Sequence, residues 1–394
     1  MKIEPKTLGY ICTTAHPIGC ATRIDQDIAA VQAHGVIEGP KRVLVIGSSM
    51  GYGLASRIVA GFGCKAATVG VFLERQSVGN RTASAGWYNT AAFSRRSREA
   101  GIPALNINGD AFSAEVKSRT LDCIRTELDG PIDLVVYSLA APRRVDPSTG
   151  RRFSSAIKPI GMPFEARTLD LMRGEISAVT MQPATDDEIE QTVAVMGGDD
   201  WRLWIEALED ANLLADGIQT VAYSYVGPPL VAPIYREGTI GQAKVDLEKT
   251  ARSLSKKLQH RNGRALVAIN KALVTQSSSA IPVVPLYLSI LFRVMREKHL
   301  HEGTIDQMIR LFANYLTDPE APLDEENRIR LDDKEMRSAV QEEVLRIWEE
   351  ISTENLTALS DIERHQRDFL QLFGFQVEGV DYTADVDPVV SMDR

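Results

Sequence analysis

The sequence predicts an α/β fold built on a doubly wound parallel sheet. Between residues 41 and 300, short apolar runs of strand length alternate with segments of helical periodicity, which is typical of repeated βα units. Several runs are apolar throughout instead of alternating with polar residues, as expected for strands that helices cover on both faces. Two intervals, 75–102 and 143–219, break this rhythm, and the chain turns helical after residue 300. We expect one large core with sizeable additions, or two domains.

The first expected strand ends in a glycine turn, and five more strand-like runs follow it. Residues 143–219 then interrupt the sheet with a Pro- and Met-containing stretch and an acidic segment that we expect to be helical. Insertions of this length usually form substrate pockets or lids, and additional packing on the core is the alternative. We expect an N-terminal extension packed on the core (1–40), the core itself (41–300) and a C-terminal helical extension (301–394). The expected strands are 43–47, 66–73, 104–108, 132–138, 220–226 and 265–270, and the expected C-terminal helices are 304–316, 335–350 and 360–373.

The bulk composition excludes several classes of protein. The chain has 394 residues, more than the roughly 250–300 at which a single core usually stops growing, and its net charge of −9 argues against a general nucleic-acid partner. The four cysteines show neither C-x-x-C nor metal-ligand spacing, so we expect no metal site. The longest apolar run, 281–292, contains two prolines and is too short for a bilayer, which needs about 20 residues. We expect a soluble, cytoplasmic protein with no membrane partner.

The most informative segment is VLVIGSSMGYGLASR, residues 43–57. An aliphatic strand stops at Gly47, Gly51 and Gly53 follow, and apolar residues then recur at helical spacing. A helix that begins after a glycine turn is an anion site, because its unpaired N–H groups and its dipole converge where no Cβ blocks a phosphate. The same letters, with Ser49 at the centre of G-x-S-x-G, also match the nucleophile elbow of α/β serine hydrolases. The turn therefore admits a nucleotide-binding and a hydrolase interpretation.

Three observations favour the nucleotide interpretation, in which the sheet is of Rossmann type. A hydrolase elbow follows several strands, whereas this turn follows the first strand of the sheet. The histidines after Ser49 lie in no strand-end loop that is suited to complete a triad. Gly53 is superfluous to an elbow but fits a phosphate turn spaced G-x-x-x-G-x-G. We expect the hydroxyls of Ser48 and Ser49 to donate to phosphate.

Residues at the ends of the next strands also fit a dinucleotide. Glu74 directly follows the second strand, where a carboxylate can accept from an adenosine ribose and disfavour a 2′-phosphate, although the neighbouring Arg75 weakens the preference for NAD over NADP. Asp110, after the third strand, is placed either to reach the adenine or to cap a helix. The fourth strand ends in small residues, 138–142, that allow the backbone to pass close to a cofactor.

Tyr235 and Lys244 form a candidate catalytic pair in the segment YREGTIGQAK. On one continuous helix, nine positions at about 100° each would put the two side chains on opposite faces. The two glycines between them weaken such a helix, and Thr239-x-x-Gln242 matches a capping box. We therefore expect Tyr235 to lie in a loop and the helix to begin near Thr239, so that Lys244 projects back towards that loop.

A tyrosine and a lysine together suit proton transfer. The tyrosine hydroxyl has an ordinary pKa of about 10 and is protonated at neutral pH, and a nearby ammonium eases the loss of its proton. Such a hydroxyl can donate a proton and stabilise an oxyanion. A Tyr–Lys pair arises by chance on many surfaces, but behind a dinucleotide turn it gains weight as catalytic machinery.

At this point the sequence resembles the large single-chain trans-2-enoyl-CoA/enoyl-ACP reductases, distant relatives of the short-chain dehydrogenases, over essentially its whole length. The specific mark is the Tyr-x8-Lys spacing, because ordinary short-chain dehydrogenases carry Tyr-x3-Lys and other enoyl reductases Tyr-x6-Lys. The other shared segments are TAHPIGC (14–20), GSSMGYGLASR (47–57), FLER (72–75), AGWYN (85–89), NGDAF (108–112), YSLAAP (137–142), WRLWIEAL (201–208), YSYVGP (223–228), KALVTQSSSAIP (271–282) and FGF…GVDY (373–382).

The resemblance implies NADH-dependent reduction of the C2–C3 double bond of a trans-2-enoyl thioester, carried by acyl-carrier protein or CoA, as the last reductive step of fatty acid elongation. By the same resemblance, Tyr235 donates the proton and stabilises the enolate, Lys244 binds the nicotinamide ribose and Tyr225 contacts the substrate carbonyl region. We expect a monomer. The resemblance further implies cofactor contacts from Ser48, Ser49, Met50, Gly51, Tyr52 and Gly53 at the pyrophosphate, Glu74 and Arg75 at the adenosine, Asp110 and Ala111 at the adenine, Leu139 and Ala140 at the middle of the cofactor, and Leu273, Val274 and Thr275 at the nicotinamide carboxamide.

The sequence departs from the family at one position and leaves alternatives open. Many relatives carry a second lysine directly after the catalytic one, whereas this chain has Val245, so we expect no second ammonium there. The apolar segment 281–292 either lines an acyl channel or belongs to the core. The alternative functions are a serine hydrolase that uses Ser49 and a carbonyl-reducing short-chain dehydrogenase, which would share the cofactor and differ in substrate.

Overall fold

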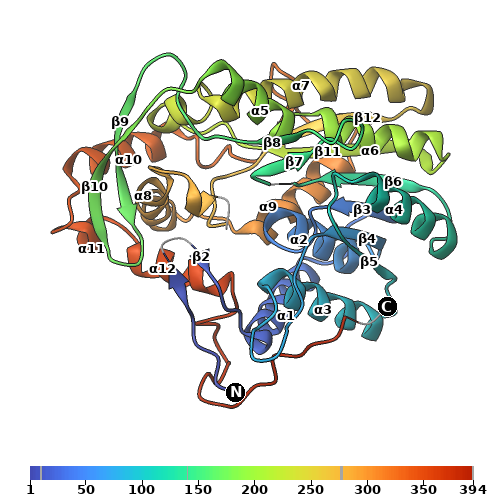
Figure 1. Cartoon of the computed structure of the whole chain (residues 1–394), viewed down its shortest axis with the longest axis horizontal. Helices are drawn as coiled ribbons and strands as arrows, with labels where there is room; N and C mark the ends of the chain where they lie inside the picture. The colour runs from blue at the N-terminus through green and yellow to red at the C-terminus, as the bar shows by residue number, and fades with distance from the viewer. Residues whose placement is uncertain (9–10, 140, 276–277, 393–394) are drawn as a thin grey trace.

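A seven-stranded parallel sheet forms the centre of the computed structural model, which describes residues 1–8, 11–139, 141–275 and 278–392 (Figure 1). The predicted α/β class is confirmed. All six predicted strands are present, and five of them have boundaries shifted by no more than a single residue. In their order across the sheet, the strands are β13 (Arg328–Arg330), β12 (Arg264–Ile269), β11 (Leu214–Ser224), β6 (Ile132–Tyr137), β3 (Arg42–Ile46), β4 (Ala67–Phe72) and β5 (Ala104–Asn108).

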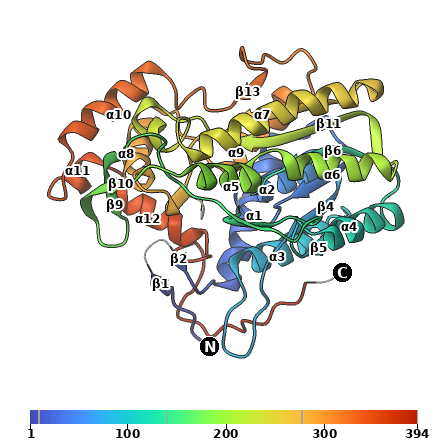
Figure 2. The same ribbon diagram turned by 45° about the horizontal axis from the view of Figure 1, so that its top comes forward.

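The central strands bury both of their faces under helices. Helices lie on both sides of the sheet (Figure 2). Val43 and Val45 pack against one helix layer, whereas the alternate residues Leu44 and Ile46 pack against the other. Apolar residues on both faces of a period-two strand explain why the runs show no polar alternation. The first layer contains α1 (Pro17–His34), α2 (Gly51–Ile58), α3 (Ala85–Glu99) and α9 (Thr304–Leu311), and the second contains α4 (Ala114–Glu127), α6 (Asp199–Asp210) and α7 (Thr239–Leu258).

The strand order places a crossover between β3 and β6. The chain builds β3, β4 and β5 outward in one direction and then returns to place β6 on the other side of β3. Ligands of open α/β sheets bind at the carboxyl ends of the strands where the order reverses in this way. Gly47 lies at this point with φ +87°, and a Cβ on it would lie 2.2 Å from the Ser138 carbonyl oxygen. Since every other residue carries a Cβ, the crossover requires glycine here.

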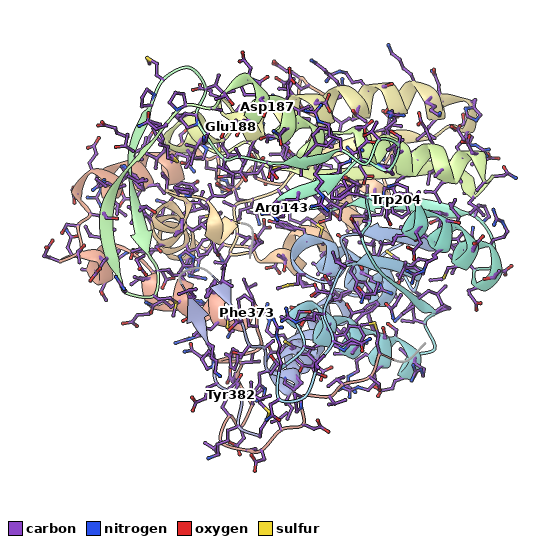
Figure 3. All side chains as sticks on the ribbon, viewed as in Figure 1. Arg143, Asp187, Glu188, Trp204, Phe373 and Tyr382 are labelled. Carbon is purple, nitrogen blue, oxygen red and sulfur yellow. The ribbon has the colours of Figure 1, made fainter. Side chains whose placement is uncertain are left out.

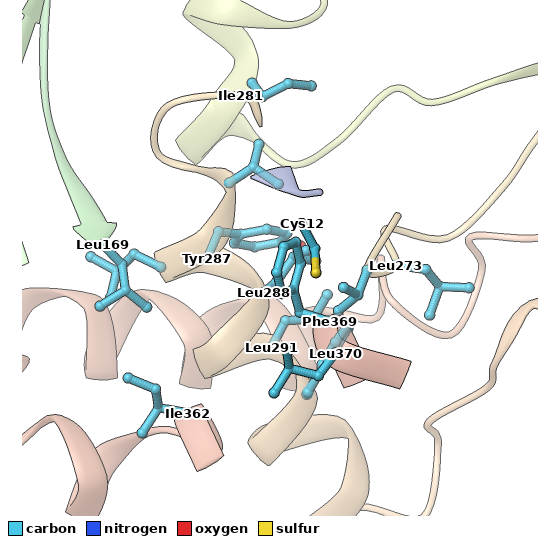
Figure 4. Close-up of a cluster of buried hydrophobic side chains, with 14 of the residues drawn as sticks. Cys12, Leu169, Leu273, Ile281, Tyr287, Leu288, Leu291, Ile362, Phe369 and Leu370 are labelled. Carbon is cyan, nitrogen blue, oxygen red and sulfur yellow. The ribbon is translucent and has the colours of Figure 1, made fainter. Parts of the chain in front are cut away.

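A second hydrophobic core surrounds helix α8 (Val284–Glu297) beside the sheet. Figure 4 shows Leu288 and Leu291 of α8 close to Phe369 and Leu370 of α12. The segment 281–292 therefore belongs chiefly to this core, which was one of the two expected roles. The elements that pack with α8 are α10 (Ser338–Glu350), α11 (Leu356–Leu359), α12 (Ile362–Gln371) and the hairpin of β9 (Phe164–Asp170) and β10 (Glu175–Met181).

The part after residue 300 is not purely helical. Strand β13 pairs with β12 as the seventh strand of the sheet, and its three residues, RIR, are too few to show a strand pattern in the sequence. Strand β11 also begins earlier than the predicted residue 220. Its pairing with β6 is irregular between Leu214 and Gln219, where Gly217 has φ +75°, and this irregularity hides the early part of the strand from a periodicity analysis.

The C-terminal segment runs back along the N-terminal region. Phe373 and Tyr382 lie in the lower part of Figure 3, where Figure 1 marks the N-terminus in the same view. The Tyr382 ring contacts the ring of His16 at a centroid distance of 4.9 Å. Farther on, the side chains of Trp87 and Tyr88 donate to the carbonyl oxygens of Val390 and Pro388 at 2.8 and 2.7 Å. These contacts tie the last residues of the chain to α3.

The remaining elements are short. They are β1 (Thr7–Leu8), β2 (Ile11–Cys12), β7 (Arg143–Val145), β8 (Arg152–Ser154), α5 (Asp186–Met196), the π-helical turns η1 (Val59–Gly63) and η5 (Phe312–Leu316), and the 3₁₀ turns η2 (Pro229–Ile234), η3 (Gln259–Arg261) and η4 (Ser278–Ala280). Within the ranges that the structure describes, no helix combines the length and apolarity needed to cross a membrane.

Gly53→Ala is expected to destabilise the fold at the crossover, because its Cβ would lie 1.9 Å from the Gly47 carbonyl oxygen. Overpacking of this kind typically costs about 1–3 kcal/mol of unfolding free energy, which urea denaturation measures. Gly303→Ala is the matched control, since the nearest atom to a Cβ there is Asp306 Oδ2 at 3.6 Å. An equal loss in both variants would contradict a close-packed crossover.

Candidate active site

A cleft of about 540 Å³ opens at the carboxyl ends of the strands, over the crossover between β3 and β6. The turns after β3, β4, β5 and β6 form one side of it, and the segments after β11 and β12 form the other together with the start of α7. The predicted residues that line the cleft are Ser49, Met50, Gly51, Tyr52, Glu74, Asp110, Ala111, Leu139, Tyr225, Tyr235, Lys244, Leu273 and Thr275.

The turn before α2 presents backbone donors to this cleft. The N–H groups of Gly51, Tyr52 and Gly53 have no hydrogen-bond partner in the part of the chain that the structure describes, and Met50 makes no side-chain cap. Gly51 has φ +55°, and the nearest atom to a Cβ on it would be Thr275 Cγ2 at 3.8 Å. Unpaired amides at the positive end of a helix suit a pyrophosphate, so the turn fits a dinucleotide.

The two serines of the turn have different environments. Ser48 is fully buried, and its N–H and hydroxyl both donate to the Val71 carbonyl oxygen, at 3.1 and 3.3 Å, so the structure does not bring it to the cleft as predicted. Ser49 lines the cleft, and its hydroxyl donates to Glu74 Oε1 at 2.7 Å. Among the described residues no histidine hydrogen-bonds Ser49, so a serine nucleophile would lack a general base. The hydrolase interpretation is therefore not supported.

Glu74, Asp110 and Ala111 form the end of the cleft that the sequence assigned to adenosine. The backbone N–H and C=O of Glu74 pair with the Asn108 side-chain amide, both at 2.9 Å, which holds Glu74 between β4 and β5. Asp110 Oδ1 accepts from the Phe112 N–H at 3.0 Å, so this carboxylate stabilises a turn while it lines the cleft. The N-cap of α4 is Ser113, so Asp110 does not have the helix-cap role that was one of its two expected roles.

Besides Ser48, three described residues that were predicted to contact the cofactor are not placed on the cleft wall. Gly53 is buried at the crossover, and Arg75 is exposed outside the lining. Val274 lines a neighbouring polar cavity instead. Ala140 lies outside the described residues. The structure therefore brings together the turn, the adenosine end and the tyrosine–lysine pair, and it leaves Ser48, Gly53, Arg75 and Val274 apart from them.

Tyr235 lies in a loop, and helix α7 begins at Thr239, as predicted. The φ and ψ of Tyr235, −109° and −94°, end the 3₁₀ turn η2 and prevent a continuous helix. The predicted capping box is wrong. The N-cap is Gly238, while the Thr239 hydroxyl donates to the Ala156 carbonyl oxygen and accepts from the Lys158 N–H at 3.2 Å. The segment that contains Ala156 and Lys158 thus holds the start of α7 in place of a local cap.

The hydroxyl groups of the cleft tyrosines distinguish Tyr235 from the others. The Tyr52 hydroxyl donates to the Lys271 carbonyl oxygen at 2.7 Å, and the Tyr225 hydroxyl donates to Glu335 Oε1 at 2.7 Å. The Tyr223 hydroxyl lies 2.5 Å from Ser56 Oγ. For the Tyr235 hydroxyl, the described residues offer no hydrogen-bond partner. Since a phenol has one proton to donate, Tyr235 is the cleft tyrosine whose proton is available to a ligand.

Burial is the main cause of the pKa shifts of Tyr235 and Lys244. It raises the pKa of Tyr235 to about 12, with a further contribution from the negative charge of Glu335, so the hydroxyl is protonated at neutral pH. Burial also lowers the pKa of Lys244 to about 8, against the opposing effect of Glu248. The Lys244 ammonium donates to the Tyr223 carbonyl oxygen at 3.3 Å, which holds it at the cleft beside the end of β11. A proton donor and a cation therefore line the same cleft.

Two residues of the site escaped sequence reasoning. Glu335 comes from the segment after β13, about 90 residues beyond the Tyr–Lys pair in the chain, and no motif marked it. Lys271 lies within the shared segment KALVTQ, but its fully buried ammonium, 4.6 Å from the centroid of the Phe292 ring, could not be inferred from that segment. Burial lowers the pKa of Lys271 to about 8.

Family models match nearly the whole chain. Residues 81–317 match the trans-2-enoyl-CoA reductase catalytic region, and residues 2–79 match the NAD(P)H binding domain of trans-2-enoyl-CoA reductase. The chain belongs to the trans-2-enoyl-CoA reductase family. The resemblance that the Tyr-x8-Lys spacing indicated is thereby confirmed.

Named relatives and a solved structure agree with this membership. An enoyl-[acyl-carrier-protein] reductase [NADH] of Coxiella burnetii is 54% identical over 390 residues, which cover 98% of this chain and 96% of that protein. A trans-2-enoyl-CoA reductase [NADH] of Clostridium perfringens is 54% identical over 387 residues, covering 98% and 99%. The crystal structure of Treponema denticola trans-2-enoyl-CoA reductase in complex with NAD matches the whole of both chains with a TM-score of 0.96 at 43% identity.

A third family model, the enoyl reductase FAD binding domain, matches residues 323–386. The residues in this range do not fit a flavin dinucleotide. Its helices α10, α11 and α12 begin without the glycine turn that admits a pyrophosphate, and the apolar face of α10 is buried in the second core. Among the described residues of this range, Leu372 alone borders the main cleft. No flavin step is therefore assigned to this protein.

The affinity of the apoprotein for NADH is expected to fall as the pH rises through about 8, because the Lys244 cation is present below its lowered pKa of about 8 and absent above it. Titration of protein fluorescence with NADH between pH 7 and pH 9.5 measures the effect, which should be several-fold. Lys244→Met should bind weakly and lose this pH dependence. Lys271→Met is the control, because that lysine titrates in the same range and should leave the dependence intact. If Lys271→Met abolished the pH dependence of NADH affinity, the assignment of that dependence to Lys244 would be contradicted.

Proposed function

We propose that this protein uses NADH to reduce the C2–C3 double bond of trans-2-enoyl thioesters carried by acyl-carrier protein or CoA. The observation that carries the proposal is the Tyr235 hydroxyl, for which the described residues offer no hydrogen-bond partner. It lines the same cleft as the Lys244 ammonium and the amides of the glycine turn. Membership of the family supports the reaction. The names of the two relatives support both carriers.

NADH fits along the cleft from the glycine turn to the segment after β12. The amides of Gly51 and Tyr52 would hold the pyrophosphate, Glu74 would accept from the adenosine ribose, and Leu273 and Thr275 would border the nicotinamide end. When bound, the cofactor supplies the hydride that adds to C3 of the enoyl group.

Tyr235 and Lys244 stabilise the negative charge that forms when hydride adds to C3. Addition at C3 leaves an enolate with its charge on the thioester oxygen. The Tyr235 hydroxyl donates to that oxygen and delivers the proton that C2 requires, and the Lys244 cation stabilises the phenolate that remains. A proton from solvent then restores the tyrosine, so each double bond consumes one hydride and one proton.

The rest of the cleft suits the acyl thioester. Leu273, Val284 and Leu372 present apolar side chains to it, which favours a hydrocarbon chain over a polar substrate. Val245, which replaces the second lysine of many relatives, does not line the cleft among the described residues. Lys244 is therefore the cation that α7 contributes to the reaction.

We place the reaction in the cytoplasm as the last reductive step of fatty acid elongation, performed by a monomer. The proposed organisation is an N-terminal extension (1–40), an NAD-binding catalytic core (41–300) whose insertion (143–219) forms part of the substrate pocket, and a C-terminal extension (301–394). Contacts of the insertion with the start of α7 support its role, since the Thr239 hydroxyl accepts from the Lys158 N–H at 3.2 Å.

Purified protein is expected to oxidise NADH only when an enoyl thioester such as crotonyl-CoA is added, as followed by NADH absorbance. Tyr235→Phe should lose about 10²- to 10⁴-fold in kcat while it retains NADH binding, because general acid catalysis contributes about this much. Tyr223→Phe is the matched control, since that hydroxyl is already shared with Ser56, and it should lose much less.

Three outcomes would contradict the proposed function. Unchanged turnover in Tyr235→Phe would exclude the proton-donor role. NADH oxidation with a ketone but not with crotonyl-CoA would indicate a carbonyl-reducing dehydrogenase. Covalent labelling of Ser49 by a fluorophosphonate probe would indicate a serine hydrolase.

A further inference from the structure

Glu335 is a fully buried carboxylate that joins three separate parts of the site. Its Oε1 accepts from the hydroxyls of Tyr225 and Tyr287, both at 2.7 Å, and its Oε2 accepts from the Ala272 N–H at 2.7 Å. Tyr225 follows strand β11, and Ala272 follows strand β12. Tyr287 lies on α8, where Figure 4 labels it. Four elements that are distant in the sequence therefore meet at one side chain.

The direction of these hydrogen bonds follows from the neighbours. The Gln341 amide donates to the Tyr287 oxygen at 3.2 Å, so the Tyr287 proton points to Glu335. A backbone N–H can only donate, which fixes Ala272 as a second donor. Burial raises the pKa of Glu335, while the nearby Lys271 ammonium and the three hydrogen-bond donors oppose that rise by favouring the ionised carboxylate, which accepts only. The Tyr225 hydroxyl donates to Oε1 of Glu335 at 2.7 Å and is thus the third donor.

Because the Tyr225 hydroxyl donates its proton to Glu335, it cannot also donate that proton to a ligand. A phenol that has donated its proton presents only oxygen lone pairs, and a thioester oxygen also presents only lone pairs. Two acceptors cannot hydrogen-bond each other. The ring of Tyr225 lies edge-on to the ring of Tyr235, with the centroids 4.8 Å apart, so the two hydroxyls belong to neighbouring positions in the cleft with opposite hydrogen-bonding roles.

We propose that Glu335 is a positioning residue for the reaction: it takes the proton of Tyr225 as a hydrogen bond, so that Tyr225 meets the substrate as an acceptor and leaves the thioester oxygen to Tyr235. This inference rests on the proposed reductase function and adds a division of labour between the two tyrosines. Glu335 thereby prevents a second phenol proton from competing with that of Tyr235 for the developing enolate. Its bond to the Ala272 N–H holds it in place.

The test compares Glu335→Gln, Tyr225→Phe and the double variant in steady-state kinetics with crotonyl-CoA and NADH. Glu335→Gln should raise the KM for crotonyl-CoA about tenfold while the Kd for NADH changes less than twofold. Tyr225→Phe should raise the same KM, with a far smaller loss of kcat than Tyr235→Phe. The double variant should be no worse than the poorer single variant, because Glu335 acts through Tyr225.

Asp332→Asn is the matched control. Asp332 is also fully buried, lies in the same segment as Glu335, and pairs with Arg330 through both oxygens at 2.7 and 2.8 Å, away from the cleft. This variant should lose thermal stability and keep the KM for crotonyl-CoA. An equal rise of that KM in Asp332→Asn would assign the effect to a loosened segment and overturn the proposal.

Other results also overturn the positioning role. Wild-type kinetics in Glu335→Gln, or effects of Glu335→Gln and Tyr225→Phe that multiply in the double variant, would show that Glu335 does not act through Tyr225. If Glu335→Gln does not fold, Tyr225→Phe still tests the proposal. A loss of kcat as large as that of Tyr235→Phe would show that Tyr225 donates to the enolate, which overturns the proposal. Wild-type enzyme that fails to reduce crotonyl-CoA refutes the proposed function itself, and this result is distinct from all of these.

Discussion

A phenol has one proton, and a tyrosine that already donates this proton within the protein cannot donate it to a ligand. Tyr52 and Tyr225 give theirs to a carbonyl oxygen and a carboxylate, and Tyr223 shares a hydrogen bond with Ser56. Among the described residues, this leaves Tyr235 as the donor for a bound substrate, in the same cleft as the Lys244 cation. The catalytic assignment therefore depends on the partners of the other tyrosines as much as on Tyr235 itself.

The fold explains how these groups meet. The crossover between β3 and β6 requires the close contact of Gly47 and Ser138, and it opens the cleft above the glycine turn. The ends of β11 and β12 then bring Tyr225 and the segment after Ile269 to the opposite wall. Glu335 connects these two strand ends to the second hydrophobic core, so the C-terminal part of the chain supports the site without lining most of it.

The sequence predicted what local patterns encode. Apolar runs located six of the seven strands, and the glycines between Tyr235 and Lys244 correctly predicted a loop before α7. The capping box at Thr239 was wrong because the insertion supplies its partners instead. Ser48 carries the same hydroxyl as Ser49 in the sequence, and only the packing of β4 shows that it donates to Val71.

The position and contacts of Glu335 could not be predicted from the sequence. This residue follows a strand of three residues in an acidic segment, where one more carboxylate carries no signal. Its role depends on tertiary contacts with side chains and backbone from three other elements. Patterns within a window of the sequence report on helices, strands and turns, and they do not report which buried donors share an acceptor.

The most direct measurement is a crystal structure of the unreactive ternary complex with NAD⁺ and an enoyl-CoA, in which the oxidised cofactor cannot supply hydride. The thioester oxygen is predicted to lie within hydrogen-bond distance of the Tyr235 hydroxyl, with Lys244 against the nicotinamide ribose and Tyr225 still bound to Glu335. A thioester oxygen bound by the Tyr225 hydroxyl, with the contact to Glu335 broken and Tyr235 turned away, would contradict the central claim.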